Sequence, residues 1–193
     1  MAKRLLDKVL VVDVEATCWD GPAPPDETND IIEIGVAVLD VASGERVDRA
    51  GILVRPERSR VSAFCTELTT LTQEDVDAGM PFADACALLR SEYRAHERVW
   101  ASWGEYDRLQ FERQCGDLGV PYPFGGRHLN AKTLYALAHA LPREPGMAGA
   151  LAHAGKPLEG THHRGVDDAW NIAGLLGDLL GAARGQRGTD DRT

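Results

Sequence analysis

Three strand-like segments near the start of the chain most constrain its fold. Residues 9–17 (VLVVDVEAT) and 31–40 (IIEIGVAVLD) are rich in β-branched side chains, and residues 46–55 alternate enough to form a third strand. Residues 19–29 are rich in Pro, Gly, Asp and Asn and predict a loop, and residues 42–45 (ASGE) predict a turn. Strands connected in this way favour an antiparallel meander.

The rest of the chain alternates helices with short strands. We expect a helix start at Thr72, strands at residues 98–102 (RVWAS) and 127–130 (RHLN), and a last helix with a clear apolar stripe. The order β-β-β-α-β-α-β-α-α predicts an α/β domain with a mixed five-stranded sheet flanked by helices. The other expected helices cover residues 81–97, 107–118 and 132–141.

The composition is that of one soluble domain. Of the 193 residues, 44% are hydrophobic, and no apolar run approaches the roughly 20 residues that a membrane helix needs. We expect a single domain over residues 1–183 and a flexible polar tail over residues 184–193. The start of the chain lacks a small-residue cleavage site, and the four cysteines form no CxxC pair. We therefore expect no signal peptide, no zinc site and a cytoplasmic location.

The net charge limits how the chain can interact with nucleic acid. A formal charge of −9 argues against a broad basic surface that coats nucleic acid. The charge is compatible with an enzyme that binds a short stretch of nucleic-acid backbone through bound cations. Part of the acidic excess must then be carboxylate that a metal ion neutralises.

Asp13 and Glu15 lie at the end of the first expected strand. Residues two apart in a strand point to the same face, roughly 7 Å apart along it. Like charges held there repel each other unless a proton or cation intervenes, and a pair of divalent metal ions would remove the conflict. Taken alone, the triplet favours the simpler interpretation of two acids that reach solvent at a strand end, since such triplets are common.

The segment HHRGVDD before the last helix offers two pairs five residues apart, His162 with Asp167 and His163 with Asp168. Asp168 aligns with the apolar stripe of the helix, whereas Asp167 falls on its polar side. A carboxylate on an inward edge needs a partner, and a metal ion is a suitable one. Gly165 allows the chain to bend, so that His163 leans over the site as a general base. A solvated pair of histidines is the alternative.

Asp107 follows the fourth expected strand, at the start of a helix. It fits an N-cap as well as a metal ligand, and one carboxylate has enough lone pairs for both. Phe64 and Leu68 lie in residues 62–69 (SAFCTELT), which we expect to form a turn. There they either stack on and wedge a terminal base or pack at the base of a loop.

In combination, D-x-E after the first strand, an Asp after the fourth and H-x4-D at the last helix form the DEDDh signature. The chain resembles DEDDh 3′–5′ exonucleases over about residues 9–181, and most resembles the branch of the histone-mRNA 3′ exonucleases and the bacterial sporulation-inhibitor type. The strings that carry this resemblance are DVEATCWD (13–20), IIEIG (31–35), SAFCTELTTLTQEDVD (62–77), ASWGEYD (101–107) and HHRGVDDAWNIA (162–173).

The resemblance implies a ribonuclease-H-like fold and a two-metal mechanism with Mg²⁺ or Mn²⁺. It implies that Asp13 bridges both metals, and that Glu15 and Asp168 hold the metal that carries the attacking water. Asp107 would support the second metal, and His163 would take the proton. The expected substrate is the 3′ end of single-stranded nucleic acid, RNA favoured and DNA possible, with nucleoside 5′-monophosphates as products. The residues expected to contact the substrate are Thr17, Phe64, Leu68 and Trp103.

Two departures from the family pattern limit what is transferred. Residues 68–71 read Leu-Thr-Thr-Leu where Leu-Thr-Gly-Ile is more usual, which puts the turn geometry in question. Only eight residues precede the first expected strand, so we do not transfer specificity for structured RNA. Two other classes fit the same fold. A metal-poor binding module is disfavoured because all five chemical positions are present, and an endonuclease or resolvase is disfavoured by the H-x4-D placement.

Overall fold

The structure, a computed structural model, describes residues 5–185. Its centre is a five-stranded sheet of order β3-β2-β1-β4-β5. β1 (Lys8–Ala16), β2 (Ile31–Asp40) and β3 (Arg46–Leu53) are antiparallel neighbours. β4 (Val99–Ser102) runs parallel to β1, and β5 (His128–Asn130) runs parallel to β4. The predicted meander and the predicted mixed sheet are both confirmed.

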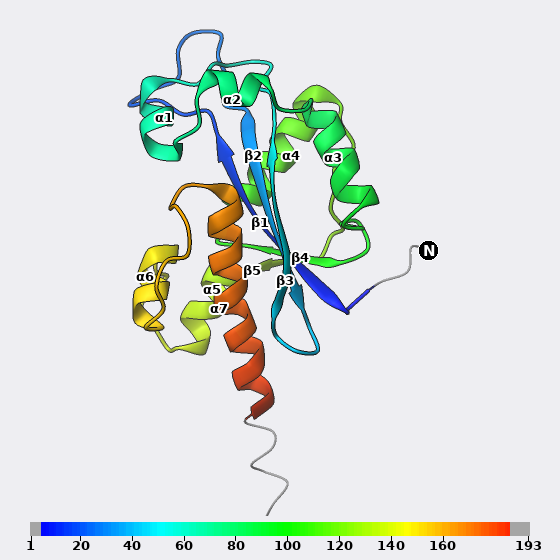
Figure 1. Cartoon of the computed structure of the whole chain (residues 1–193), viewed down its shortest axis with the longest axis vertical. Helices are drawn as coiled ribbons and strands as arrows, with labels where there is room; N and C mark the ends of the chain where they lie inside the picture. The colour runs from blue at the N-terminus through cyan, green and yellow to red at the C-terminus, as the bar shows by residue number, and fades with distance from the viewer. Residues whose placement is uncertain (1–4, 186–193) are drawn as a thin grey trace, which may run out of the picture.

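Helices cover both faces of the sheet (Figure 1). α3 (Phe82–Ser91) and α4 (Tyr106–Leu118) pack on the face that carries Leu10, Val12 and Val14. α5 (Ala131–Ala138), α6 (Met147–His153) and α7 (Gly165–Gly185) pack on the face that carries Val9 and Val11. Because side chains alternate along β1, the strand contributes to the hydrophobic cores on both faces of the sheet. Asp13 and Glu15 lie on the face that α7 covers. Two short helices, α1 (Ala63–Thr69) and α2 (Gln73–Asp77), lie near the end of β1.

Several expected helix boundaries were wrong. The segment expected to form a turn instead forms helix α1 over Ala63–Thr69, because the hydroxyl of the preceding Ser62 accepts a hydrogen bond from the Cys65 N–H and caps the helix. α3 ends at Ser91 instead of continuing to residue 97, and Arg94 takes a left-handed backbone (φ 52°) that a helix cannot continue. α6 was not expected at all, since its sequence MAGALAH is short and has no side-chain cap.

The structure also shows how the helix expected at Thr72 begins and where the last helix ends. The helix start at Thr72 is confirmed, with a reciprocal capping box between Thr72 and Asp75. α7 continues through Gly185, two residues into the expected tail, and residues 186–193 lie outside the described residues. Within residues 5–185, no helix combines the length and the apolar character that crossing a membrane requires.

The start of α7 sits directly on the sheet because two glycines meet there. A Cβ on Gly35 of β2 would lie 1.8 Å from the Gly165 carbonyl oxygen, and one on Gly165 would lie 2.9 Å from the Asp13 carbonyl oxygen. Gly165 is the first residue of α7, so it does not provide the bend before the helix that its position suggested. Its missing side chain instead lets the helix touch β1 and β2. That contact brings the first turn of α7, with Asp168, against β1.

Candidate active site

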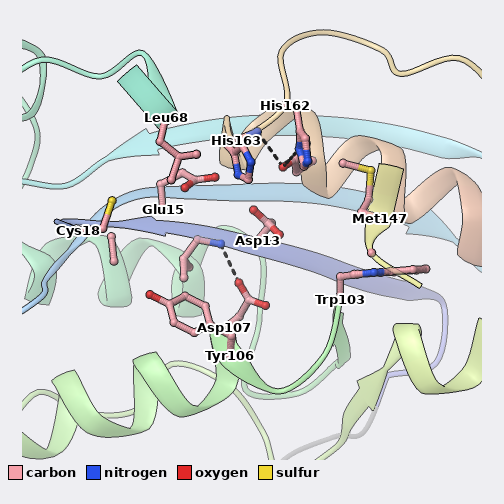
Figure 2. A pocket seen from close by; sticks show the side chains of 14 residues that line it. Asp13, Glu15, Cys18, Leu68, Trp103, Tyr106, Asp107, Met147, His162 and His163 are labelled. Atoms are coloured by element: carbon pink, nitrogen blue, oxygen red, sulfur yellow. Dashed lines mark hydrogen bonds and ion pairs between the residues drawn. The ribbon is translucent and has the colours of Figure 1, made fainter. Parts of the chain in front are cut away.

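A cleft of about 440 Å³ opens at the C-terminal end of β1. Figure 2 shows Asp13 and Glu15 directed into it from β1, with His162 and His163 on one side and Asp107 on the other. The structure brings the five residues of the predicted catalytic set together in its lining, from β1, α4, the loop before α7 and α7 itself. These residues are Asp13, Glu15, Asp107, His163 and Asp168.

Three of these carboxylates form a compact cluster. Oxygens of Asp13, Glu15 and Asp168 all lie within 4.8 Å of one another. Removal from water, followed by repulsion from the neighbouring carboxylates, raises the pKa of Asp13 well above its ordinary range and that of Glu15 to about 8. Removal from water also raises the pKa of Asp168. Hard oxygen donors held against their mutual repulsion suit a divalent cation such as Mg²⁺ or Mn²⁺.

Asp107 is fixed to the edge of β1. β1 pairs with β4 only over Val9–Val11, so the N–H of Val14 lies beyond the ladder, and it donates to Asp107 Oδ1 at 2.9 Å. The N-cap of α4 is Glu105, so the alternative role of Asp107 as N-cap is wrong. Removal from water raises the pKa of Asp107 to about 6, although the Val14 hydrogen bond opposes the shift.

Both histidines approach Asp168. The His163 backbone N–H donates to Asp168 Oδ2 at 3.0 Å, and His162 Nδ1 lies 3.0 Å from the same oxygen. The two rings stack with centroids 3.9 Å apart. Removal from water, followed by repulsion from His162, lowers the pKa of His163, which favours the neutral form that a general base needs. Asp167 lies outside the lining and accepts the Thr161 N–H at 2.9 Å.

The predicted substrate-contacting residues separate into two groups. Leu68 from α1 and Trp103 after β4 line the cleft. Phe64, 39% exposed, lies one turn from Leu68 on α1 but is outside the lining. Thr17 is fully buried, and its hydroxyl lies 2.6 Å from Ser59 Oγ. Substrate contacts by all four residues, Thr17, Phe64, Leu68 and Trp103, stay predictions.

Seven further residues line the cleft without having been singled out as cleft residues: Val14, Ala16, Cys18, Tyr106, Gly146, Met147 and His162. Tyr106 is 54% exposed and immediately precedes Asp107, so its position at a strand-to-helix junction could have indicated it. Met147 begins α6, a helix with no sequence signal, and nothing in the sequence pointed to it.

Comparisons with known proteins decide the family. The model of the exonuclease family called RNase T matches residues 10–176. The chain belongs to this family. It is 30% identical over 198 residues to the 3′-5′ exonuclease Snipper of Drosophila melanogaster, covering 91% of this chain and 70% of that protein. It is 30% identical to 3′-5′ exoribonuclease 1 of Homo sapiens, where 93% of this chain covers 54% of the relative.

A solved structure extends the comparison to three dimensions. The nuclease domain of 3′hExo, a DEDDh family member bound to rAMP, matches with a TM-score of 0.84 and 28% identity, over 94% of this chain and 95% of that one. The ribonuclease-H-like exonuclease fold is therefore confirmed. The enzyme class is likewise that of the 3′–5′ exonucleases of DEDDh type.

Proposed function

We propose that this exonuclease removes nucleotides from the 3′ end of single-stranded RNA in a reaction that depends on divalent cations, and that it accepts single-stranded DNA as a second substrate. The observation that carries the proposal is the convergence of Asp13, Glu15 and Asp168, with Asp107 beside them, in one open cleft. The preference for RNA is supported by relatives named exoribonucleases and by the rAMP in the related nuclease domain.

The acidic cluster fits a pair of cations. Its carboxylates are hard oxygen ligands, and their mutual repulsion is relieved when cations replace protons. Asp13, Glu15 and Asp168 would hold one ion, and Asp13 and Asp107 would support the other. Two such ions supply an activated water and stabilise the departing 3′ oxygen.

His163 has the role of proton acceptor in this proposal. Its pKa is lowered, so the imidazole is neutral near pH 7 and can take a proton from the attacking water. His163 lines the cleft next to Asp168. The 3′-terminal base would rest on the apolar and aromatic surfaces of the cleft, which are supplied by Leu68, Trp103 and Tyr106.

The test is digestion of matched single-stranded RNA and DNA oligomers, labelled at the 5′ end, with Mg²⁺ or Mn²⁺. We expect ladders that shorten from the 3′ end, nucleoside 5′-monophosphates as products, faster loss of RNA, and no activity in Asp13→Ala or with a chelator. Binding without shortening would instead indicate a binding module. Cleavage of a circular single strand would indicate an endonuclease.

A further inference from the structure

Besides the four carboxylates of the proposed reaction, a fifth one, Glu33, lies close to the site. The proposed reaction gives it no role. It is 1% exposed, and in the sheet it stands directly opposite Glu15, since the two residues are register partners in β2 and β1. Opposite residues of an antiparallel pair share a face, and like charges placed there destabilise the sheet. A buried carboxylate in this position needs specific partners.

Two consecutive residues supply those partners. Arg164 donates from Nε to Glu33 Oε2 at 3.1 Å and from Nη2 to Oε1 at 2.9 Å, and the Gly165 N–H donates to Oε2 at 2.8 Å. The two arginine contacts form a bidentate pair, the geometry that best fixes a guanidinium. The carboxylate also has little room, because a Cβ on Gly51 would lie 3.0 Å from its Oε1. Glu33 therefore clamps residues 164 and 165 to the sheet.

The clamp begins at the residue after His163. His163 has a left-handed backbone with φ 62°, a conformation that is unfavourable for a residue with a Cβ. Such a conformation persists only where the surroundings hold it. On one side the His163 N–H is held by Asp168, and on the other Arg164 and Gly165 are held by Glu33.

We infer that Glu33 is a positioning residue for hydrolysis, which acts by fixing the backbone that carries His163. This inference rests on the proposed function. Glu33 does not line the cleft, so its effect on the reaction passes through Arg164, Gly165 and His163. Its charge is already matched by Arg164, which leaves the cations to Asp13, Glu15 and their partners.

The test variant is Glu33→Gln, which keeps the shape and one acceptor but loses the bidentate pairing. We expect kcat to fall at least tenfold, while KM and the Mg²⁺ affinity measured by calorimetry change less than threefold. In a His163→Ala background the same substitution should lower kcat less than twofold. In the cation-free protein, the His163 backbone amide should exchange its hydrogen faster.

Asp30→Asn is the matched control. Asp30 is an equally buried acid that accepts from Arg58 Nε at 2.9 Å and from Nη2 at 2.7 Å, and it also accepts two backbone N–H groups. Asp30→Asn should lower the stability of the protein but leave the hydrogen exchange of the His163 backbone amide unchanged. If it lowers kcat, the factor should be the same in the wild-type and in the His163→Ala background.

Three results would overturn the inference: an unchanged kcat in folded Glu33→Gln, a loss fully additive with His163→Ala, or a parallel fall in Mg²⁺ affinity. A wild-type protein that shortens neither oligomer would instead refute the proposed function itself. The amide exchange of His163 is still informative in that case, because it needs no activity.

Discussion

The backbone N–H of Val14 donates a 2.9 Å hydrogen bond to Oδ1 of Asp107, a residue 93 positions later in the chain. The bond lies on the β4 side of β1, beyond the last paired residues of the two strands, so the carboxylate replaces a missing strand partner. Val14 separates Asp13 from Glu15, and the same bond therefore fixes Asp107 beside the acidic cluster. One side chain thus completes the sheet and lines the cleft.

The two roles of Asp107 can be separated by substitution. Asp107→Asn keeps an oxygen for the Val14 N–H but loses the negative charge, so we expect a free energy of unfolding within about 1 kcal/mol of wild type and a loss of kcat/KM of about 100-fold or more. Asp107→Ala also leaves a buried N–H unpaired and should cost a further 1–3 kcal/mol or so. Denaturant titration and 3′-end digestion measure the two effects. Equal stability of the two variants would contradict the structural role.

A second prediction concerns the close contact between Gly35 and Gly165. Gly35→Ala places a Cβ 1.8 Å from the Gly165 carbonyl oxygen, and the start of α7 must shift away from the sheet. We expect a loss of stability of about 1–3 kcal/mol or more and a loss of activity in the fraction that remains folded. Gly116→Ala, inside α4 with nothing within 4 Å, is the control. It should stabilise the protein by about 0.5–1 kcal/mol and leave the activity unchanged.

Thr70 is the third residue of Leu-Thr-Thr-Leu (68–71), the string whose turn geometry the sequence left in question. It ends α1 in a left-handed conformation (φ 65°), with its N–H bonded to the Thr66 carbonyl oxygen at 2.8 Å. The turn geometry is thus formed in spite of the β-branched side chain, which is strained there. Thr70→Gly should raise the free energy of unfolding by about 0.5–1 kcal/mol. Thr72→Ala, two residues away, removes the α2 cap and should lower it by about 1 kcal/mol. A destabilised Thr70→Gly would show that the conformation carries no strain.

Sequence periodicity could predict the parts of the site that depend on local geometry. The alternation in β1 placed Asp13 and Glu15 on the face of Val9 and Val11, and the α7 stripe separated Asp168 from Asp167. The other parts depend on contacts between distant residues, which leave no periodic signal. Gly35 and Gly165 lie 130 positions apart, and neither reveals the other. The helix α1 was missed because it ends at a threonine rather than at a glycine.

The raised pKa of Glu15 makes the stability of the cation-free protein depend on pH. Its pKa rises from an ordinary value of 4.5 to about 8, so between these values the folded protein keeps a proton that the unfolded chain releases. The contribution of Glu15 to stability is therefore lost as pH rises from about 4.5 to about 8. Glu15→Gln removes this dependence, and in a chelator it should be more stable than wild type at pH 9, by on the order of a few kcal/mol, but not at pH 4.5.

Thermal melts across this pH range measure the effect, with Glu57→Gln, an exposed acid, as the control. Added Mg²⁺ should make the wild type more stable than Glu15→Gln at pH 9. The cation stabilises the ionised cluster of the wild type, whereas Glu15→Gln offers it one carboxylate ligand fewer. Asp13 and Asp168 have raised pKa values as well, so the rise in melting temperature on adding Mg²⁺ should be larger at pH 8 than at pH 5. A shift that is independent of pH would mean that cations bind elsewhere.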